Sequence, residues 1–448
     1  MKVKILSSNQ MQQNPITHIG EELPFQFPGY KFGKMIEDFS PEIILLQECI
    51  AVDSVFKIGK EFVSIFEFDF NERIELYQKH KINRIHVDDA FPKSDYFNSN
   101  YYKFFSRAIS DPKIGRKSDY GNVILVNRKI VKKISKITCL NANCLDNISG
   151  SILGIELKLL SGKILKIINI YSNPKNIENA QLEKFKTEYF QLLQDQKIDC
   201  KIEKSCLELM SNSRAMKMHE IFIDFFLAIP DFFDVNDNLI IGGDFNSSSF
   251  GFCVNNDKSW INYFSKLYEK NIFDSLREYN LLPQPTFVST YGSLAHQSDY
   301  LLLSKNLCDG ILHCETAEKK DVFIQYESGK WVKDSSDHLP IKLELNLEKK
   351  NVAQPFTSSF KAYLLIELYV YLFHSENYFL TEKTKSKLML AKKKHLSRIN
   401  ASGRYSIDTS SKSNVYNRER ILNELFILFN KAEISEIIYK KLKTILDS

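Results

Sequence analysis

The stretch Leu239–Phe250, which reads L-I-I-G-G-D-F-N-S-S-S-F, carries the residues most suited to chemistry. Its leading apolar residues predict a short buried strand, and the two glycines predict a tight turn at its end. Asp244 and Asn246 follow two positions apart, so an extended chain directs both side chains to the same side. A carboxylate there can orient or deprotonate a water molecule, and the amide can donate to a phosphoryl oxygen. The alternative is that both residues only cap the turn.

Further acidic, amide, phenol and imidazole groups lie at the boundaries of other predicted strands. In chain order they are Asn9, Glu48, Tyr171, Asp299 and the neighbours Asp337 and His338. The edge of a sheet where strands end is the usual ligand site of α/β proteins. With the stretch of Asp244 and Asn246, six separate stretches place such groups at strand boundaries. Solubility alone hardly explains this pattern.

These residue types also suggest which chemistry such an edge would support. Glu48 and Asp337 are hard oxygen ligands of the kind that Mg²⁺ prefers. An aspartate paired with a histidine gives an oriented imidazole, which can move a proton or contact a phosphoryl oxygen. For Glu48 the alternative is a plain surface residue at a strand end, and for Tyr171 it is a buried phenol bonded to the backbone.

The pattern around these residues predicts one α/β layered domain over residues 1–348. Strands dominate it, with predicted helices at Tyr30–Phe39, at 174–233 and at 259–270. Two stretches lack clear strand periodicity and are predicted to be insertions, at about 77–116 and 174–211. The first holds aromatic residues beside Lys103 and Arg107, a mixture that suits stacking on single-stranded bases or a small core of its own.

Composition limits the possible classes of protein. The chain has 448 residues, of which 44% are hydrophobic and 26% charged, as in ordinary folded proteins. Its eight cysteines form no C-x-x-C pair, which argues against a zinc site and a disulfide framework. The N-terminus lacks the apolar core of a signal peptide, and no apolar run reaches the roughly 18 residues that span a bilayer. We therefore expect a soluble intracellular protein, in the cytoplasm.

The last hundred residues differ from the rest in charge. Residues 349–448 contain 18 Lys and Arg against 9 Asp and Glu, whereas the remainder contains 42 against 46. An apolar helix at Phe360–Phe373, a basic stretch at Lys383–Arg398 and amphipathic helices at Arg418–Leu446 are predicted. This basic helical region could bind nucleic acid, an anionic membrane or a protein partner, or could simply be a solvated helix face.

Together the motifs resemble the endonuclease/exonuclease/phosphatase superfamily, whose fold is the DNase I-like one. The segments that carry the resemblance occur in the family's order across residues 1–347 and are S-S-N (Asn9), L-L-Q-E (Glu48), N-I-Y-S-N-P (Tyr171), G-G-D-F-N (Asp244, Asn246), S-D-Y-L-L (Asp299) and S-S-D-H-L-P (Asp337, His338). The resemblance implies a four-layer α/β/β/α sandwich, here with a helical C-terminal extension, and a phosphodiester hydrolase that depends on Mg²⁺, with Mn²⁺ as a possible substitute.

The resemblance also implies a role for each residue. Glu48 would hold the metal, supported by Asn9 and Asp337. Asp244 would activate the attacking water, Asn246 would contact the scissile phosphate, and His338, held by Asp299, would stabilise the transition state. Many family members have a histidine where Tyr171 stands; a tyrosine there resembles the AP-endonuclease branch, and Tyr171 would act on the leaving group or bind substrate.

The expected activity is therefore that of a nuclease acting on DNA or RNA. Two alternatives stay open on the sequence alone. One is a phosphoinositide- or sphingolipid-type phosphohydrolase of the same superfamily, although the residues around G-G-D-F-N lack the tryptophan and Tyr-Arg pair of the inositol-polyphosphate 5-phosphatases. The other is a binding or scaffolding protein that keeps the fold without turnover.

Overall fold

The computed structural model describes part of the chain, including every predicted site residue. The described residues are 1–10, 30–50, 52–58, 61–64, 82–86, 95–111, 116–137, 151–172, 187, 234, 237–246, 267, 270–280, 286–288, 295–318, 321, 323–325, 331–333 and 336–348. The predicted basic helical region at 349–448 and nearly all of the predicted helices at 174–233 and 259–270 lie outside them. No helix within the described ranges is long and apolar enough to cross a membrane.

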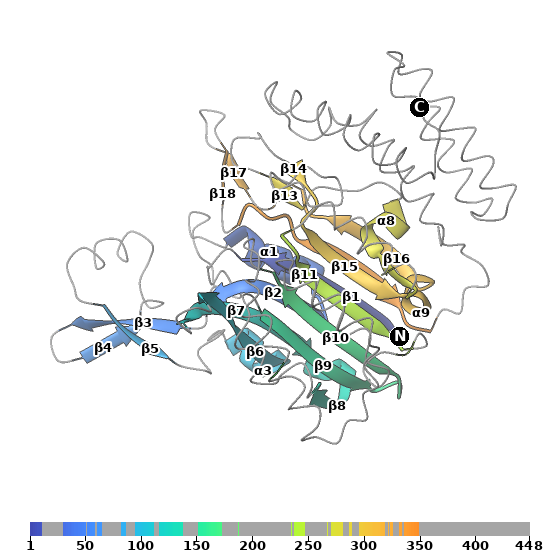
Figure 1. Ribbon diagram of the computed structural model, residues 1–448, viewed down its shortest axis with the longest axis horizontal. Coiled ribbons are helices and arrows are strands. Elements are labelled where there is room, and N and C mark those ends of the chain that lie inside the picture. The colour runs from blue at the N-terminus through green and yellow to red at the C-terminus, as the bar shows by residue number, and fades with distance from the viewer. Residues whose placement is uncertain are drawn as a thin grey trace, which may run out of the picture.

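One large sheet, here called the first sheet, has six strands in the order β16-β19-β1-β2-β7-β6 (Figure 1). These strands are β1 (Lys2–Asn9), β2 (Ile43–Ile50), β6 (Tyr101–Asp111), β7 (Arg116–Asn127), β16 (Ile311–Thr316) and β19 (Ile341–Asn346). β1 and β2 run parallel, and the other neighbours are antiparallel. The carboxyl ends of β1 and β2 therefore meet at one edge, where Asn9 pairs with Gln47.

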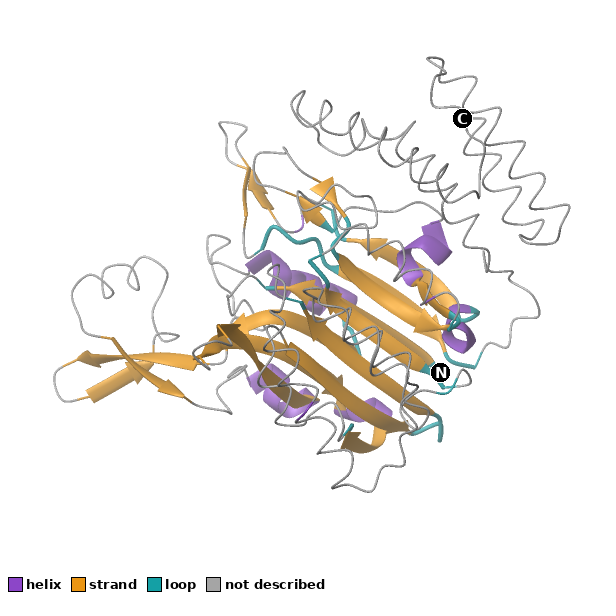
Figure 2. Cartoon of the chain, in the orientation of Figure 1, coloured by secondary structure: helices purple, strands orange, loops and turns teal. Residues whose placement is uncertain are grey.

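The second sheet also has six strands, in the order β12-β15-β11-β10-β9-β8. They are β8 (Val131–Lys136), β9 (Ser151–Leu159), β10 (Ile164–Tyr171), β11 (Leu239–Asp244), β12 (Ile272–Asp274) and β15 (Asp299–Ser304). β10 and β11 run parallel, and the others are antiparallel. Strands dominate the described part of the chain (Figure 2), and the two mixed sheets confirm the predicted fold class.

The two sheets pack face to face, with β1 and β2 against β10 and β11. Alternation along β2 sends Leu45 and Gln47 toward the second sheet. A Cβ atom on Gly242 of β11 would lie 2.3 Å from Leu45 Cδ1, so this glycine is what lets the sheets approach. Gln47 donates across the gap from Nε2 to Asn169 Oδ1 at 2.7 Å. The layer between the two sheets is thus apolar and contains a buried hydrogen bond between Gln47 and Asn169.

Helix α1 (Tyr30–Phe39) covers the outer face of the first sheet, where the sequence predicted it. Its apolar residues recur at helical spacing and pack on the strands beneath in one buried cluster. Members of this cluster are Phe32, Met35 and Ile36 of α1 and Ile44, Leu46, Val123 and Leu125 of the sheet. The shorter helices α8 (Ser275–Asn280) and α9 (Lys305–Cys308) lie beside β15.

The predicted insertion at 77–116 contains regular elements, although its sequence lacks clear strand periodicity. It contains β5 (Ile82–His86), α3 (Asp95–Asn100) and the whole of β6, which forms an edge of the first sheet. β5 pairs with β3 (Val52–Ile58), whose other neighbour is β4 (Glu61–Ser64). Phe97 is fully buried in the α1 cluster, and the hydroxyl of buried Tyr101 donates to the Pro41 carbonyl at 2.6 Å. These two aromatic residues therefore pack a core instead of facing a ligand.

Candidate active site

The predicted site residues come together at one edge of the sandwich. On the second sheet Tyr171 pairs with Asp244, and Asp244 pairs with Asp299, so the three stand in one row across β10, β11 and β15. On the first sheet Asn9 ends β1, Glu48 lies near the end of β2, and His338 precedes β19. Strand direction thus brings most of these residues from both sheets to the same edge, and a bulge adds Glu48.

The G-G-D-F-N turn is shaped by two positive φ angles. Gly243 has φ 146°, and a Cβ atom there would lie 1.9 Å from the Ile170 carbonyl oxygen, so only glycine fits. Asn246 has φ 45°, a left-handed conformation that asparagine tolerates better than most residues. Its Nδ2 donates both to the Ser172 carbonyl at 2.8 Å and to Asp244 Oδ2 at 2.9 Å. The amide predicted to meet phosphate therefore also holds the carboxylate beside it.

Asp244 is fully buried and accepts three hydrogen bonds. Besides the Asn246 amide, its Oδ2 accepts from Asn9 Nδ2 at 2.8 Å, and its Oδ1 accepts from the Asn246 backbone N–H at 2.8 Å. Burial raises the pKa of Asp244, and the charge of Asp299 raises it further; His338 opposes them, and the pKa lies at about 7. A carboxylate fixed in this way, with a pKa near neutrality, is suited to accept a proton from water.

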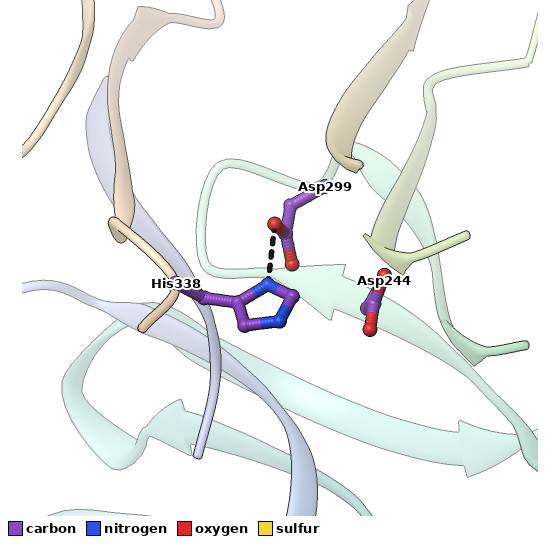
Figure 3. Close-up of side chains that lie close together, drawn as sticks. All are labelled: Asp244, Asp299 and His338. Carbon is purple, nitrogen blue, oxygen red and sulfur yellow. Dashed lines mark hydrogen bonds and ion pairs between the residues drawn. The ribbon is translucent and has the colours of Figure 1, made fainter. Parts of the chain in front are cut away.

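Asp299 and His338 form a buried pair next to Asp244 (Figure 3). His338 Nδ1 lies 2.8 Å from Asp299 Oδ2, which also accepts from Ser298 Oγ at 3.1 Å. Burial on its own would lower the pKa of His338, but the charge and hydrogen bond of Asp299, with Asp244 and Asp337 adding, raise it to about 10. The imidazole is therefore cationic at neutral pH and oriented by Asp299.

Glu48 reaches the site through a break in the β2 ladder. The pairing of β2 with β7 shifts between Leu46 and Cys49, and Glu48 within this bulge has φ 52°. Alternation would have sent it to the α1 side with Leu46; the bulge turns it toward the second sheet instead. Tyr171 and Asn9 hydrogen-bond its carboxylate there. The left-handed glutamate is a local backbone cost that the surrounding contacts must offset.

The charges around Glu48 fit a divalent cation. Burial raises the pKa of Glu48, and Asp337 contributes in the same direction, while Tyr171, His338 and Asn9 oppose them. A cation between the carboxylates of Glu48 and Asp337 would offset the effect of Asp337 on Glu48, and oxygen ligands with room for water suit Mg²⁺. Glu48, Asp337 and Asn9 thus fit the predicted metal-binding role.

A second group of ligand atoms lies alongside. Single atoms of Asp244, Asp299 and His338 all lie within 4.8 Å of one another, close enough to hold a metal ion. Asp299 Oδ1 is buried and has no hydrogen-bond partner among the described residues. Within this group, however, His338 Nδ1 is already bonded to Asp299, which is the arrangement of an acid–imidazole pair.

Sequence reasoning missed the polar residues that support the site. Asn169 and Gln47 stand within apolar strand patterns, and Thr286 stands in a stretch predicted only to be extended. All three are fully buried. A polar residue inside an apolar run is the signal that could have marked them, because buried polar groups must find partners.

Comparison with protein-family models finds no match, and comparison with curated proteins finds none either. Solved structures do match. An AP endonuclease from Archaeoglobus fulgidus has 13% identity and a TM-score of 0.41, over 77% of this chain and 99% of that one. An endonuclease/exonuclease/phosphatase family protein from Leptotrichia buccalis has 15% identity and a TM-score of 0.40, with the same coverages. The 3' phosphatase NExo from Neisseria, bound to a product DNA hairpin, has 15% identity and a TM-score of 0.39, again over 77% and 99%.

These matches are to the family that the motifs resemble. Identities of 13–15% with TM-scores near 0.4 add no weight to an assignment of activity.

Proposed function

We propose that this protein is a Mg²⁺-dependent phosphodiester hydrolase that acts on nucleic acid, by in-line attack of water. The observation that carries the proposal is the convergence of Asp244 with the Asp299–His338 pair, whose ligand atoms lie within 4.8 Å of one another beside Glu48. A proton acceptor with a pKa of about 7 and an imidazole with a pKa of about 10 stand side by side. That is the combination of base and cation that hydrolysis of a phosphate ester needs.

In this proposal Asp244, which Asn9 and Asn246 hold in place, accepts the proton of the attacking water. His338 donates from Nε2 to a phosphoryl oxygen as charge builds up on it, while Asp299 keeps Nδ1 protonated and the ring in position. Tyr171 supplies a phenol O–H whose pKa is raised, chiefly by burial and the charge of Glu48, so that it stays a hydrogen-bond donor. For Asn246 to contact the phosphate, its Nδ2 must release the Ser172 carbonyl or Asp244, because both of its N–H groups are already donated to them.

Glu48, Asp337 and Asn9 would hold the metal ion. A bound divalent cation supplies charge neutralisation to the phosphoryl group and its leaving oxygen. Mg²⁺ fits the oxygen donors best, and Mn²⁺ accepts the same ligands.

Nucleic acid is the proposed substrate because of Tyr171. A tyrosine at this position resembles the AP-endonuclease branch, and its ring packs edge-on against Tyr120 at 5.9 Å between centroids. A scaffold without turnover is disfavoured because burial of two carboxylates and an imidazole destabilises the fold, and a scaffold would gain no activity from them.

The test is a panel of single- and double-stranded DNA, RNA, a phosphoinositide and sphingomyelin, each with Mg²⁺ and with EDTA. Asp244→Asn is the matched control, since it keeps the shape of the side chain and removes the proton acceptor. We expect EDTA-sensitive cleavage of nucleic acid that Asp244→Asn abolishes. Preferential cleavage of a lipid would overturn the substrate assignment, and cleavage of nothing, or cleavage that Asp244→Asn leaves intact, would overturn the activity.

A further inference from the structure

Thr286 makes two hydrogen bonds at the base of the Asp299–His338 pair. It is fully buried, and its Oγ1 accepts from the backbone N–H of Ser298 and from that of Asp299, both at 2.9 Å. A hydroxyl oxygen has two lone pairs, so these two amides occupy its whole capacity as an acceptor. The side chain is thus committed to the backbone that carries Asp299.

The need for such an acceptor follows from the sheet. The β11–β15 ladder ends at the pairing of Asp244 with Asp299. Beyond that pair the carbonyl of Ser298 accepts a hydrogen bond from the Phe245 N–H at 2.9 Å. The backbone N–H groups of Ser298 and Asp299 need a different acceptor. Buried N–H groups left without an acceptor destabilise the folded state. Thr286 supplies that acceptor at the position where Asp299 leaves the sheet.

The same short segment also contacts His338. The Thr286 carbonyl accepts from the Leu339 N–H, and the neighbouring Phe287 forms a β-bridge with His338. The Phe287 ring meets the imidazole edge-on, with 5.2 Å between centroids and 73° between planes. Phe287 itself belongs to β13 (Phe287–Val288), which pairs with β14 (Ala295–His296) just before Asp299. Two consecutive residues therefore contact both members of the pair: Thr286 binds the backbone of Asp299, and Phe287 packs against the ring of His338.

We propose that Thr286 is a positioning residue for the proposed hydrolysis: its hydroxyl fixes Asp299, and its main chain fixes the loop of His338, so that the two side chains meet. This rests on the proposed function for its effect on turnover, but the geometry on which it depends is separate. Catalytic groups must be held to within about 0.5 Å of their working positions, and a displacement of about 1 Å can cost about 100-fold in rate. Removal of the hydroxyl frees the Asp299 backbone at the point from which its carboxylate extends.

The closing experiment compares Thr286→Val with Thr286→Ser in the full chain. Valine keeps the shape of threonine and removes the acceptor, whereas serine keeps the acceptor. We expect Thr286→Val to lower kcat about 10- to 100-fold at nearly unchanged KM, and Thr286→Ser to stay within a few-fold of the wild type. Ser304→Ala is the control: Ser304 ends the same strand, is equally buried, and its Oγ accepts from the Leu239 N–H at 3.0 Å, far along β15 from the site. It should lose stability without losing kcat.

A second readout does not depend on turnover. An imidazole N–H bonded to a carboxylate gives a strongly downfield proton resonance, which His338→Gln identifies by its disappearance. We expect this resonance in the wild type, in Thr286→Ser and in Ser304→Ala, and its loss or displacement in Thr286→Val. An unchanged resonance in folded Thr286→Val, or kcat equal to that of Ser304→Ala, would overturn the positioning role.

The two readouts also separate the two proposals. If the wild type hydrolyses no phosphate ester, the proposed function fails while the resonance still decides the role of Thr286. If Thr286→Val does not fold, Thr286→Ala takes its place, and a resonance and kcat equal to those of Thr286→Ser would overturn the proposal in the same way.

Discussion

The two titrating side chains of the site have opposite requirements. Asp244 must be deprotonated to accept a proton from water, and His338 must be protonated to donate to phosphate. Their pKa values of about 7 and about 10 predict that kcat/KM rises as the pH passes 7 and falls as it passes 10, at fixed Mg²⁺.

Asp299→Asn removes the charge that raises the pKa of His338. The fall of kcat/KM at high pH, the basic limb of the profile, should therefore move to lower pH, and kcat should fall about 10²- to 10⁴-fold. A basic limb that stays in place in Asp299→Asn would contradict this assignment.

The buried charge of Asp244 also affects stability. A carboxyl group whose folded-state pKa is raised from 3.8 to about 7 contributes stability below pH 4, and this contribution is lost as the pH rises through 7. In EDTA, the melting temperature of Asp244→Asn relative to the wild type should therefore increase between pH 5 and pH 8. In the free energy of unfolding the gain over this range is on the order of 3 kcal/mol at most, since the titration from pH 5 to pH 7 spans two pH units at about 1.4 kcal/mol each. Parallel melting curves at all pH values would show that the carboxylate carries no such cost.

Glu48 gives a separate prediction about the metal. Glu48→Gln keeps the size of the side chain and its ability to form hydrogen bonds, and it removes the charge that faces Asp337. We expect calorimetric titration to show weaker Mg²⁺ binding and the assay to show loss of turnover, with little change in the melting temperature in EDTA. Full activity in Glu48→Gln would remove Glu48 from the metal site.

At the scale of elements, the β2 bulge depends on an amide from the opposite sheet. Asn169 Nδ2 donates across the gap to the carbonyls of Leu46 and Val123, both at 2.9 Å, where the β2–β7 ladder shifts. Its Oδ1 accepts from Gln47. These groups are all buried, so this one side chain satisfies the backbone atoms that the bulge leaves unpaired. It thereby stabilises the bend that turns Glu48 toward the site.

Asn169→Leu should consequently cost several kcal/mol in the free energy of unfolding, since each stranded buried group costs about 1–3 kcal/mol. Mg²⁺ affinity should fall as well, because the bulge is no longer held. Asn238→Leu is the control, because its Nδ2 donates to the Ile164 carbonyl at 3.0 Å in a more exposed position at the other end of β10. Urea unfolding of the two variants measures the difference, and equal costs would count against the role of Asn169.

The sequence was sufficient wherever local pattern decides structure. Local pattern predicts α1 at Tyr30–Phe39, and apolar runs predict the central strands, which places Asp244 and Asp299 at one edge. Pattern failed at polar edge strands: β8 (V-K-K-I-S-K) and β16 (I-L-H-C-E-T) have too little apolar alternation to be recognised. It failed equally for contacts that depend on register between distant segments. The hydrogen bonds of Asn9 and the bulge at Glu48 arise from the pairing of strands, which no local stretch encodes.

At the scale of the whole molecule, every strand that the structure describes in the two sheets lies before residue 349. β19 pairs with β1 along its length, and the Leu347 N–H reaches the Met1 carbonyl at 2.9 Å. His338 lies just ahead of that last strand. Every predicted site residue and all twelve strands of the two sheets therefore precede the basic region at 349–448.

A chain that ends at Lys350 should accordingly fold and hydrolyse a small phosphodiester with the kcat of the full chain. Its affinity for a long polyanion should be lower and should depend less on salt, because it lacks the 16 Lys and Arg of residues 351–448. Each phosphate that is no longer neutralised reduces the slope of log K against log salt by about 0.7 to 0.9.

The matched variant is the full chain with Lys392, Lys393 and Lys394 replaced by glutamine. It should reproduce part of the change in slope. A salt slope equal in all three proteins would show that the basic residues do not touch the polyanion, and an insoluble shortened chain would show that the catalytic unit extends beyond residue 350.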